Sequence, residues 1–181
     1  MKASVYIASS LDGYIAREDG DIDWLHSSDN NDASEDYGYE KFIGSVDALI
    51  MGRNSFEKVL SFDKWPYDDK CVVVLSSHSV AIPDELKTSV ESSMLEPSAL
   101  LVALESRGIN HVYIDGGKTI QSFLRAGVIS DFIITRIPIL LGGGIPLFGS
   151  LDRDINLKHI STQSYSSGLV QSKYEVVQGV A

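Results

Sequence analysis

The run Gly-Gly-Lys-Thr at residues 116–119 combines residue types that can hold an anion. It follows the apolar run Val112–Ile114 and precedes Ile120, Phe123 and Leu124 at helical spacing, so the pattern predicts a strand, a glycine turn and a helix. Glycine lets the backbone approach a ligand closely, and the free N–H groups at a helix start favour an anion. Taken alone, such a turn is more often a plain connection, so the rest of the sequence must decide.

Two other apolar runs end in residues of the same kind. Ala48–Met51 leads into Gly-Arg-Asn-Ser at 52–55 and then into a helical pattern over Phe56–Leu60. Cys71–Leu75 leads into the polar cluster Ser-Ser-His-Ser at 76–79. Because ligands of α/β proteins gather at the carboxyl ends of strands, three such ends predict one shared binding site.

Length and composition indicate one globular domain over residues 1–181. Hydrophobic residues make up 44% and charged residues 22% of the chain, which is ordinary for a water-soluble protein. The formal net charge of −10 argues against a nucleic-acid or anionic-membrane surface, so neither partner is expected. A phosphate site must therefore rely on local cations and backbone amides.

Cysteine and histidine usage argues against disulfides and metals. Cys71 is the single cysteine, and its apolar neighbours predict a buried, inert thiol. The four histidines lack the spacing typical of a zinc site, so no metal is expected. The sequence starts with a strand pattern rather than a signal peptide and has no apolar run of membrane-spanning length, so we expect a cytoplasmic protein.

The remaining pattern alternates strands and helices. An acidic loop, residues 18–36, precedes a helix that we expect to begin with Ser34 as its N-cap. The glycines at 142–144 are interpreted either as a backbone bulge near the glycine turn or as a ligand site. Further expected elements are strands Ser4–Ser9, Tyr14–Ala16, Thr88–Ser92 and Asp131–Ile139, a helix Pro97–Arg107 ended by Gly108, and a hairpin of Leu157–Gln163 with Leu169–Val177.

Five ordered motifs resemble the dihydrofolate reductase-like family over nearly the whole chain. The branch to which the chain is most similar is the reductase domain of the bifunctional riboflavin-biosynthesis deaminase-reductase, with its stand-alone relatives. The resemblance implies a three-layer α/β fold, in which helices flank a central, mostly parallel twisted sheet with an antiparallel C-terminal hairpin. The motifs are SLDGYI at 10–15, MGRNSFE at 51–57, LSS at 75–77, DGGK at 115–118 and LGGGIPLF at 141–148.

The resemblance also implies that NADPH lies across the strand ends. It assigns the adenosine 2′-phosphate to the turn at Arg53 and to the serines after the third strand, and the pyrophosphate to the glycine turn. Two alternatives stay open: Arg53 is an exposed helix-start residue, or the serines are ordinary turn residues. The implied cofactor-binding residues are Ala8, Ile15, Gly52, Arg53, Asn54, Ser55, Leu75, Ser76, Ser77, Gly116, Gly117, Lys118, Thr119 and Ile120.

The motifs define the proton donor less clearly. Asp12 lies in the family's S-x-D-G motif beside the expected nicotinamide site. Asp36 lies at a distance before Gly52 that matches the carboxylate of folate-reducing members, with Glu35 and Asp29 as alternatives. We predict Asp12 and Asp36 as catalytic residues; the structural alternatives are an Asp-Gly turn and ordinary loop solvation.

These features predict an NADPH-dependent reductase that transfers a hydride to a small heterocyclic substrate, pteridine-like or ribosylamino-pyrimidine-like. Trp24 and Tyr39 are the predicted substrate contacts, with Trp24 alternatively a hydrophobic anchor of its loop. The H-x-E and P-C-x-x-C signatures of the zinc deaminase half are absent from the sequence. The resemblance implies a homodimer with the strand Phe132–Ile139 near the interface. The alternative function is a non-catalytic, NADP-binding homodimer with a sensing or interaction role.

Overall fold

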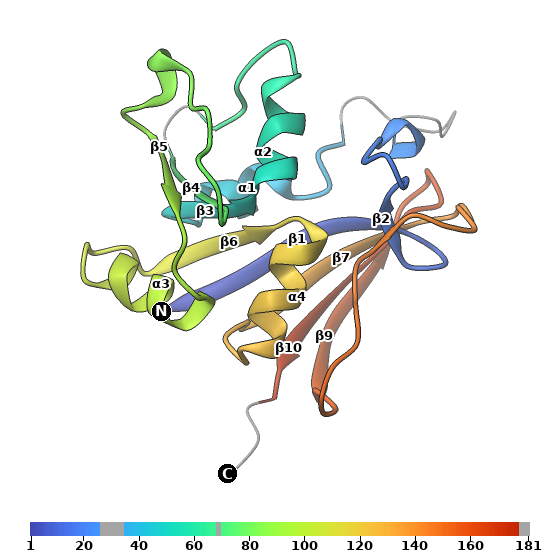
Figure 1. The fold of residues 1–181 in the computed structure, drawn as a ribbon. Coiled ribbons are helices and arrows are strands. Elements are labelled where there is room, and N and C mark those ends of the chain that lie inside the picture. The colour runs from blue at the N-terminus through green and yellow to red at the C-terminus, as the bar shows by residue number, and fades with distance from the viewer. Residues whose placement is uncertain (26–34, 68–69, 178–181) are drawn as a thin grey trace.

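A twisted sheet of eight strands runs through the molecule (Figure 1). The computed structural model describes residues 1–25, 35–67 and 70–177. The strands from β5 to β7 in the sheet run parallel, whereas β10 is antiparallel to both β7 and β9. In their order across the sheet, the strands are β5 (Val90–Ser93), β4 (Cys71–Leu75), β3 (Ala48–Gly52), β6 (His111–Asp115), β1 (Lys2–Ser10), β7 (Asp131–Ile137), β10 (Val170–Val176) and β9 (Leu157–Ser164).

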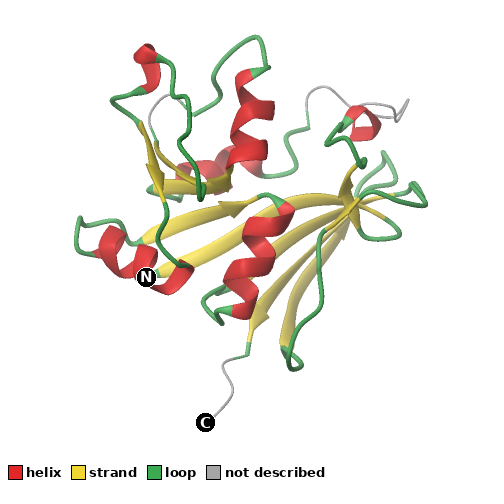
Figure 2. Ribbon diagram, in the orientation of Figure 1, coloured by secondary structure: helices red, strands yellow, loops and turns green. Residues whose placement is uncertain are grey.

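Helices cover both faces of the sheet and complete three layers (Figure 2). One core lies under α3 and α4 and contains Phe123 and Ile50, while the other lies under α1 and α2 and contains Phe56 and Leu49. Adjacent residues of β3 thus enter opposite cores, as the alternation of a strand requires. The helices are α1 (Tyr39–Gly44), α2 (Arg53–Leu60), α3 (Pro97–Glu105) and α4 (Gly117–Arg125), with short 3-10 turns η1 (Asp23–Leu25) and η2 (Asp84–Leu86).

The expected strands are all present, with small shifts at their ends. Gly108 has a φ of 85° and follows α3, as the predicted helix end requires. The strand expected near a dimer interface, β7, is hydrogen-bonded to β1 on one edge and to β10 on the other, so its backbone lies inside the sheet. None of the helices in the described ranges is long and apolar enough to cross a membrane.

The helix α1 begins later than the sequence pattern predicts, because left-handed backbone precedes it. Tyr37 and Gly38 have φ values of 56° and 85°. Asp36 caps the helix: its carboxylate oxygens accept hydrogen bonds from the N–H groups of Gly38 and Glu40, each at 2.9 Å. Ser34, the expected N-cap, lies outside the described residues.

A second, two-stranded sheet pairs β2 (Tyr14–Ala16) with β8 (Ile145–Pro146). Gly144 precedes β8 with a φ of 145°, and a Cβ there would lie 2.2 Å from the carbonyl oxygen of Ala16. A Cβ on Gly117 would lie 3.1 Å from the carbonyl oxygen of Pro146. The glycine run therefore lets the backbone pass close to β2 and brings β8 against the start of α4, which supports the backbone interpretation.

Candidate functional site

A cavity of about 640 Å³ opens at the carboxyl ends of β3 and β6. Its walls come from the turns that lead into α2 and α4, from β1 and β2, from α1, and from the loop after α2. This is the edge of an α/β sheet at which ligands gather. It is also the edge at which the sequence predicts a shared site.

Two helix starts meet at one end of the cavity. The helices α2 and α4 begin directly after Gly52 and Gly116. The two turns touch, since a Cβ on Gly116 would lie 2.4 Å from Ser55 Oγ and a Cβ on Gly52 would lie 3.1 Å from Thr119 Oγ1. Gly116 also has a φ of 87°, which favours glycine. The N–H groups of both helix starts and the two hydroxyls form a cradle suited to phosphate groups.

Arg53 and Lys118 bring positive charge to this cradle, and both line the cavity. Arg53 Nε lies 3.5 Å from Glu57 Oε1 on the exposed helix surface, a type of contact that is weak in water. Lys118 is exposed and makes no ion pair with the residues that the structure describes. Both cations are therefore available to an anionic ligand.

Most of the predicted cofactor residues line the cavity, and three do not. Ser76 Oγ accepts a hydrogen bond from the N–H of His78 at 3.1 Å, and Ser77 Oγ lies 3.0 Å from Nδ1 of the same histidine, so both serines serve the turn after β4. Ile120 is fully buried in the core beneath α4. Those that line the cavity are Ala8, Ile15, Gly52, Arg53, Asn54, Ser55, Leu75, Gly116, Gly117, Lys118 and Thr119, joined by the predicted substrate contact Tyr39.

The two predicted catalytic carboxylates, Asp12 and Asp36, lie outside the cavity lining. Asp12 accepts hydrogen bonds from the Ser10 hydroxyl at 2.6 Å and from the N–H groups of Leu141 and Gly142 at 3.2 and 2.7 Å. These donors, the hydroxyl first, lower the pKa of Asp12. The N–H groups that Asp36 caps lower its pKa in the same way. Both carboxylates are held ionised by their own loops, which does not suit a proton donor.

Trp24 also lies outside the cavity lining. Its side chain is 1% exposed and packs with Ile137 and Leu169 in a small separate core. Of the two interpretations of Trp24, the structure supports the hydrophobic anchor of the loop.

Asp115 is the one carboxylate among the described residues that line the cavity, although its Asp-Gly-Gly motif reads as a turn. It faces a group of tyrosines, Tyr6, Tyr39, Tyr67 and Tyr113, that also line the cavity. Burial raises the pKa of Asp115. Burial also raises the pKa of Tyr6 and that of Tyr39 to about 12, so these hydroxyls stay neutral. Of this group, sequence reasoning named only Tyr39, as a substrate contact, because the members come from separate elements.

Gln171 of β10 holds one of these tyrosines in place. Its amide nitrogen donates to the Tyr6 hydroxyl at 3.2 Å and lies 3.0 Å from both the Tyr37 carbonyl oxygen and the Thr135 hydroxyl. The Tyr6 hydroxyl in turn donates to the Tyr37 carbonyl at 2.9 Å. The chain entering α1 and the C-terminal hairpin therefore orient Tyr6 together.

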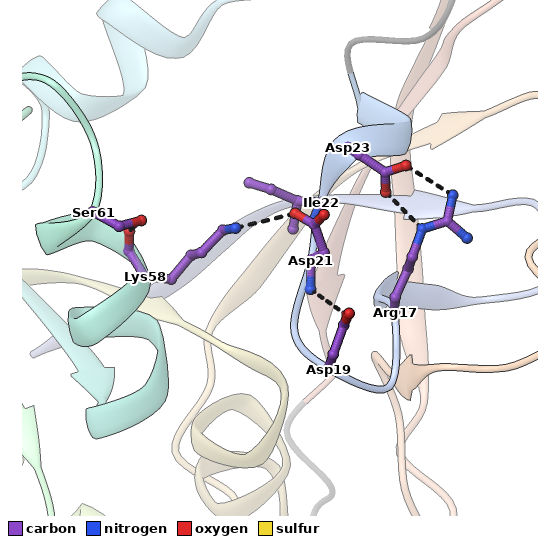
Figure 3. A network of polar contacts seen from close by, with 7 residues as sticks. All are labelled: Arg17, Asp19, Asp21, Ile22, Asp23, Lys58 and Ser61. Atoms are coloured by element: carbon purple, nitrogen blue, oxygen red, sulfur yellow. Dashed lines mark hydrogen bonds and ion pairs between the residues drawn. The ribbon is translucent and has the colours of Figure 1, made fainter.

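A further wall of the cavity is tied together by an ion pair (Figure 3). Lys58 reaches from α2 to Asp21, with Nζ 3.1 Å from Oδ1. Lys58 lines the cavity, and so does Ile22, the neighbour of Asp21. This contact is the main cause of the lowered pKa of Asp21. The segment between β2 and η1 is thus bridged to α2 across the cavity.

The described ranges contain no group of three or more His, Cys, Asp or Glu side chains placed to hold a metal ion. Cys71 lies half-buried at the start of β4, remote from the cavity lining, and burial raises the pKa of its thiol. Neither observation adds chemistry to the site.

Known structures with this architecture include three informative ones. The crystal structure of a Shewanella sp. PV-4 protein, whose name attributes it to riboflavin biosynthesis, is 42% identical with a TM-score of 0.92, covering 98% of this chain and 100% of that one. A Thermotoga maritima diaminohydroxyphosphoribosylaminopyrimidine deaminase/5-amino-6-(5-phosphoribosylamino)uracil reductase is 17% identical with a TM-score of 0.71, covering 97% of this chain and 56% of that one. An Enterococcus faecalis dihydrofolate reductase complexed with NADP(H) is 15% identical with a TM-score of 0.67, covering 98% and 97%.

These structures confirm the fold predicted from the motifs: the sheet, its antiparallel C-terminal strands and the flanking helices are those of the dihydrofolate reductase-like fold. The family model of the RibD C-terminal domain matches residues 3–171, which span all the elements described above except Lys2 of β1 and most of β10. The chain therefore belongs to the RibD C-terminal domain family, a group of reductases with the dihydrofolate reductase-like fold.

Proposed function

We propose that the protein is an NADPH-dependent reductase that transfers a hydride to a small heterocyclic substrate. The observation that carries this proposal is the contact between the two helix starts, at Ser55 and Gly116, in the same cavity that holds Asp115 and the tyrosines. The cavity lining combines groups that can bind phosphates with neutral phenols and a carboxyl whose pKa is raised by burial. A dinucleotide with a heterocycle beside it needs both.

The residues at the cradle fit NADPH better than NADH. A 2′-phosphate adds negative charge that needs a nearby donor, and Arg53 stands at the start of α2 with a guanidinium that can bind it. Lys118 and the N–H groups after Gly116 suit the pyrophosphate. The dihydrofolate reductase structure described above holds NADP(H), which supports this choice of cofactor.

When bound, NADPH supplies a hydride from its nicotinamide ring. Ala8 and Ile15 line the cavity on the β1 and β2 side and offer apolar surface that excludes water from that ring. Burial raises the pKa of Asp115, which favours the protonated carboxyl that a proton donor needs. In this proposal Asp115 delivers that proton to the atom next to the reduced carbon.

A fluorescence titration with NADPH and, separately, NADH tests the proposal. We expect NADPH to bind more tightly, and Arg53→Ala to weaken NADPH about tenfold or more with little effect on NADH, because one charge-assisted contact is lost. Arg125→Ala, at the far end of α4, is the matched control and should change neither affinity. A protein that binds neither nucleotide would contradict the proposal.

A further inference from the structure

Two sequence motifs that take no part in the cradle, SLDGYI at 10–15 and LGGGIPLF at 141–148, meet at Asp12. The carboxylate of Asp12 accepts hydrogen bonds from the N–H groups of Leu141 and Gly142 at 3.2 and 2.7 Å. We infer that Asp12 is a positioning residue that holds the ribbon formed by β2 and β8 against the start of α4. The ribbon in turn fixes one wall of the cavity, so the inference rests on the proposed function and adds a residue to its site.

The turn that carries Asp12 is connected to β2 through one side chain. The Ser10 hydroxyl donates to Asp12 at 2.6 Å and accepts a hydrogen bond from the N–H of Tyr14, the first residue of β2, at 2.9 Å. Ser10 is 1% exposed, so little water competes for these two bonds. The orientation of the Asp12 carboxylate and the start of β2 are therefore fixed together.

The same turn also contacts the chain on the other side of β8. The carbonyl oxygen of Gly13 accepts a hydrogen bond from the N–H of Leu147 at 2.9 Å, directly after β8. Leu141 and Gly142, which Asp12 binds, precede β8. The turn thus holds the chain both before and after β8, and a shift of the turn moves the whole ribbon.

The glycine run at 142–144 makes these contacts important. Glycine loses more conformational freedom on folding than any other residue, so three glycines in succession make an ordered loop unfavourable. Hydrogen bonds from N–H groups to a carboxylate are stronger than those between neutral groups. The bonds from Leu141 and Gly142 to Asp12 therefore offset part of the lost freedom where the chain enters the run.

The ribbon packs against Gly117, the first residue of α4. A Cβ at Gly117 would lie 3.0 Å from Ile15 Cδ1 of β2 and 3.2 Å from Ile145 Cγ2 of β8. The side-chain amide of Gln121, one turn further along α4, donates to the carbonyl oxygen of Pro146 at 3.0 Å. Ile15, Gly117 and Ile145 all line the cavity. Displacing the ribbon therefore opens the cavity beside the glycine turn proposed for the pyrophosphate.

Asp12 acts on the cavity through the ribbon rather than by direct contact. Its side chain does not line the cavity, and its oxygens already accept hydrogen bonds from Ser10, Leu141 and Gly142. Arg53, proposed to bind the 2′-phosphate, stands on a different element, α2. Loosening the ribbon should therefore weaken NADPH and NADH by the same factor, whereas loss of Arg53 weakens NADPH alone.

Asp12→Asn tests the inference because it keeps the size of the side chain and replaces one of the two accepting oxygens with a donor. In fluorescence titrations we expect NADPH and NADH each to bind about tenfold more weakly, because the cavity wall is no longer held. A loss of affinity confined to NADPH overturns the inference, since it would place Asp12 at the 2′-phosphate.

Two variants serve as controls. Asp47 also accepts hydrogen bonds from two N–H groups, those of Asn110 and His111 at 2.8 and 2.9 Å, but it lies outside the cavity lining beside the amino ends of β3 and β6. Asp47→Asn should lower stability and leave both affinities unchanged. Asp152→Asn, an exposed residue outside the cavity lining, controls for the lost negative charge and should also leave both unchanged.

Amide hydrogen exchange without nucleotide, followed by NMR, measures the ribbon directly. In Asp12→Asn we expect the N–H groups of Tyr14 and Leu147 to exchange several-fold faster than in the wild type, with no such change in Asp47→Asn. Unchanged exchange at both positions overturns the inference, and so does faster exchange with wild-type affinity for both nucleotides. If the wild type binds neither nucleotide while exchange is faster in Asp12→Asn, the proposed function fails and the role of Asp12 in holding the ribbon stands.

Discussion

The hydroxyl oxygen of Tyr113 lies 3.3 Å from a carboxyl oxygen of Asp115, and it also lies 2.9 Å from the carbonyl oxygen of Tyr6. A phenol has one hydrogen, so these two acceptors share it. The Tyr113 hydroxyl is the donor in both contacts, and its hydrogen bond to Asp115 lowers the pKa of that carboxyl. Burial is the larger effect and raises the pKa of Asp115, which is why we propose this carboxyl as the proton donor.

Replacing Asp115 with Asn keeps the size of the side chain and removes its acidic proton. We expect kcat to fall on the order of 100-fold, since a positioned acid contributes at least this much, with NADPH affinity unchanged. The wild-type rate should fall at high pH as Asp115 ionises, and the variant should lose that limb of its pH profile. Asp152→Asn is the control. If Asp115→Asn keeps the wild-type kcat and the fall in rate at high pH, another group is the proton donor.

The raised pKa of Asp115 also makes stability depend on pH. The folded protein binds this proton more tightly than the unfolded chain, so the contribution of Asp115 is fully present below its ordinary pKa of about 4. It is lost as pH rises through the raised pKa. In urea unfolding from acid to neutral pH, the free energy of unfolding of the wild type should fall relative to that of Asp115→Asn.

Asp47 should change the free energy of unfolding with pH in the opposite direction to Asp115. The N–H groups of Asn110 and His111 lower the pKa of Asp47, so its contribution is present above its ordinary pKa and lost as pH falls through the lowered one. The wild type should therefore gain stability relative to Asp47→Asn as pH rises. If the free energy of unfolding of the wild type and that of Asp47→Asn change equally with pH, Asp47 does not contribute to the pH dependence.

Gly116→Ala should damage the cradle more than backbone strain alone predicts. The residue has a φ of 87°, and the new Cβ would lie 2.4 Å from Ser55 Oγ. We expect about 1–2 kcal/mol lost to the left-handed backbone, a further loss from the clash, and weaker NADPH binding. Gly108→Ala is the matched control, because Gly108 has a φ of 85° with nothing within 4 Å of its Cβ position. Gly108→Ala should lower the free energy of unfolding and leave the NADPH affinity unchanged. If Gly108→Ala and Gly116→Ala weaken NADPH binding equally, the turn at Gly116 does not hold the cofactor.

Trp24→Ala tests whether this side chain is an anchor or a substrate contact. Because Trp24 is buried against Ile137 and Leu169, we expect a loss of about 3–5 kcal/mol in the free energy of unfolding. Trp24→Phe should lose clearly less. For Trp24→Phe, the KM for a substrate should stay near the wild-type value. A tenfold or larger rise in KM with unchanged stability would instead show that Trp24 contacts the substrate.

The backbone part of the site could be predicted from the sequence because its signals are local. Apolar runs that end in Gly52 and Gly116 identify strands, turns and helix starts within a few residues, and both turns line the cavity. The start of α1 could not be predicted in the same way. A positive φ at Tyr37 carries no sequence signal of its own, and Asp36 acts from three residues before the first residue of the helix.

The tyrosine group around Asp115 could be predicted only at Tyr39, because tertiary packing assembles it. Tyr6, Tyr39, Tyr67 and Tyr113 are separated by 28 to 46 residues, so no spacing in the sequence connects them. Asp12 and Asp36 have the right residue type near the right motifs, but their carboxylates satisfy N–H groups of their own loops. The residue type alone does not reveal whether a carboxylate already accepts hydrogen bonds from its own loop in the folded protein.

The position of β1 has a consequence for how the chain folds. β1 lies between β6 and β7, and Ser4 pairs with both Tyr113 and Asp131. The first strand thus finds its neighbours only after more than a hundred residues have followed it, and such distant pairing slows folding. Until then its apolar residues have no native strand partners, and exposed apolar surface of this kind promotes aggregation during synthesis.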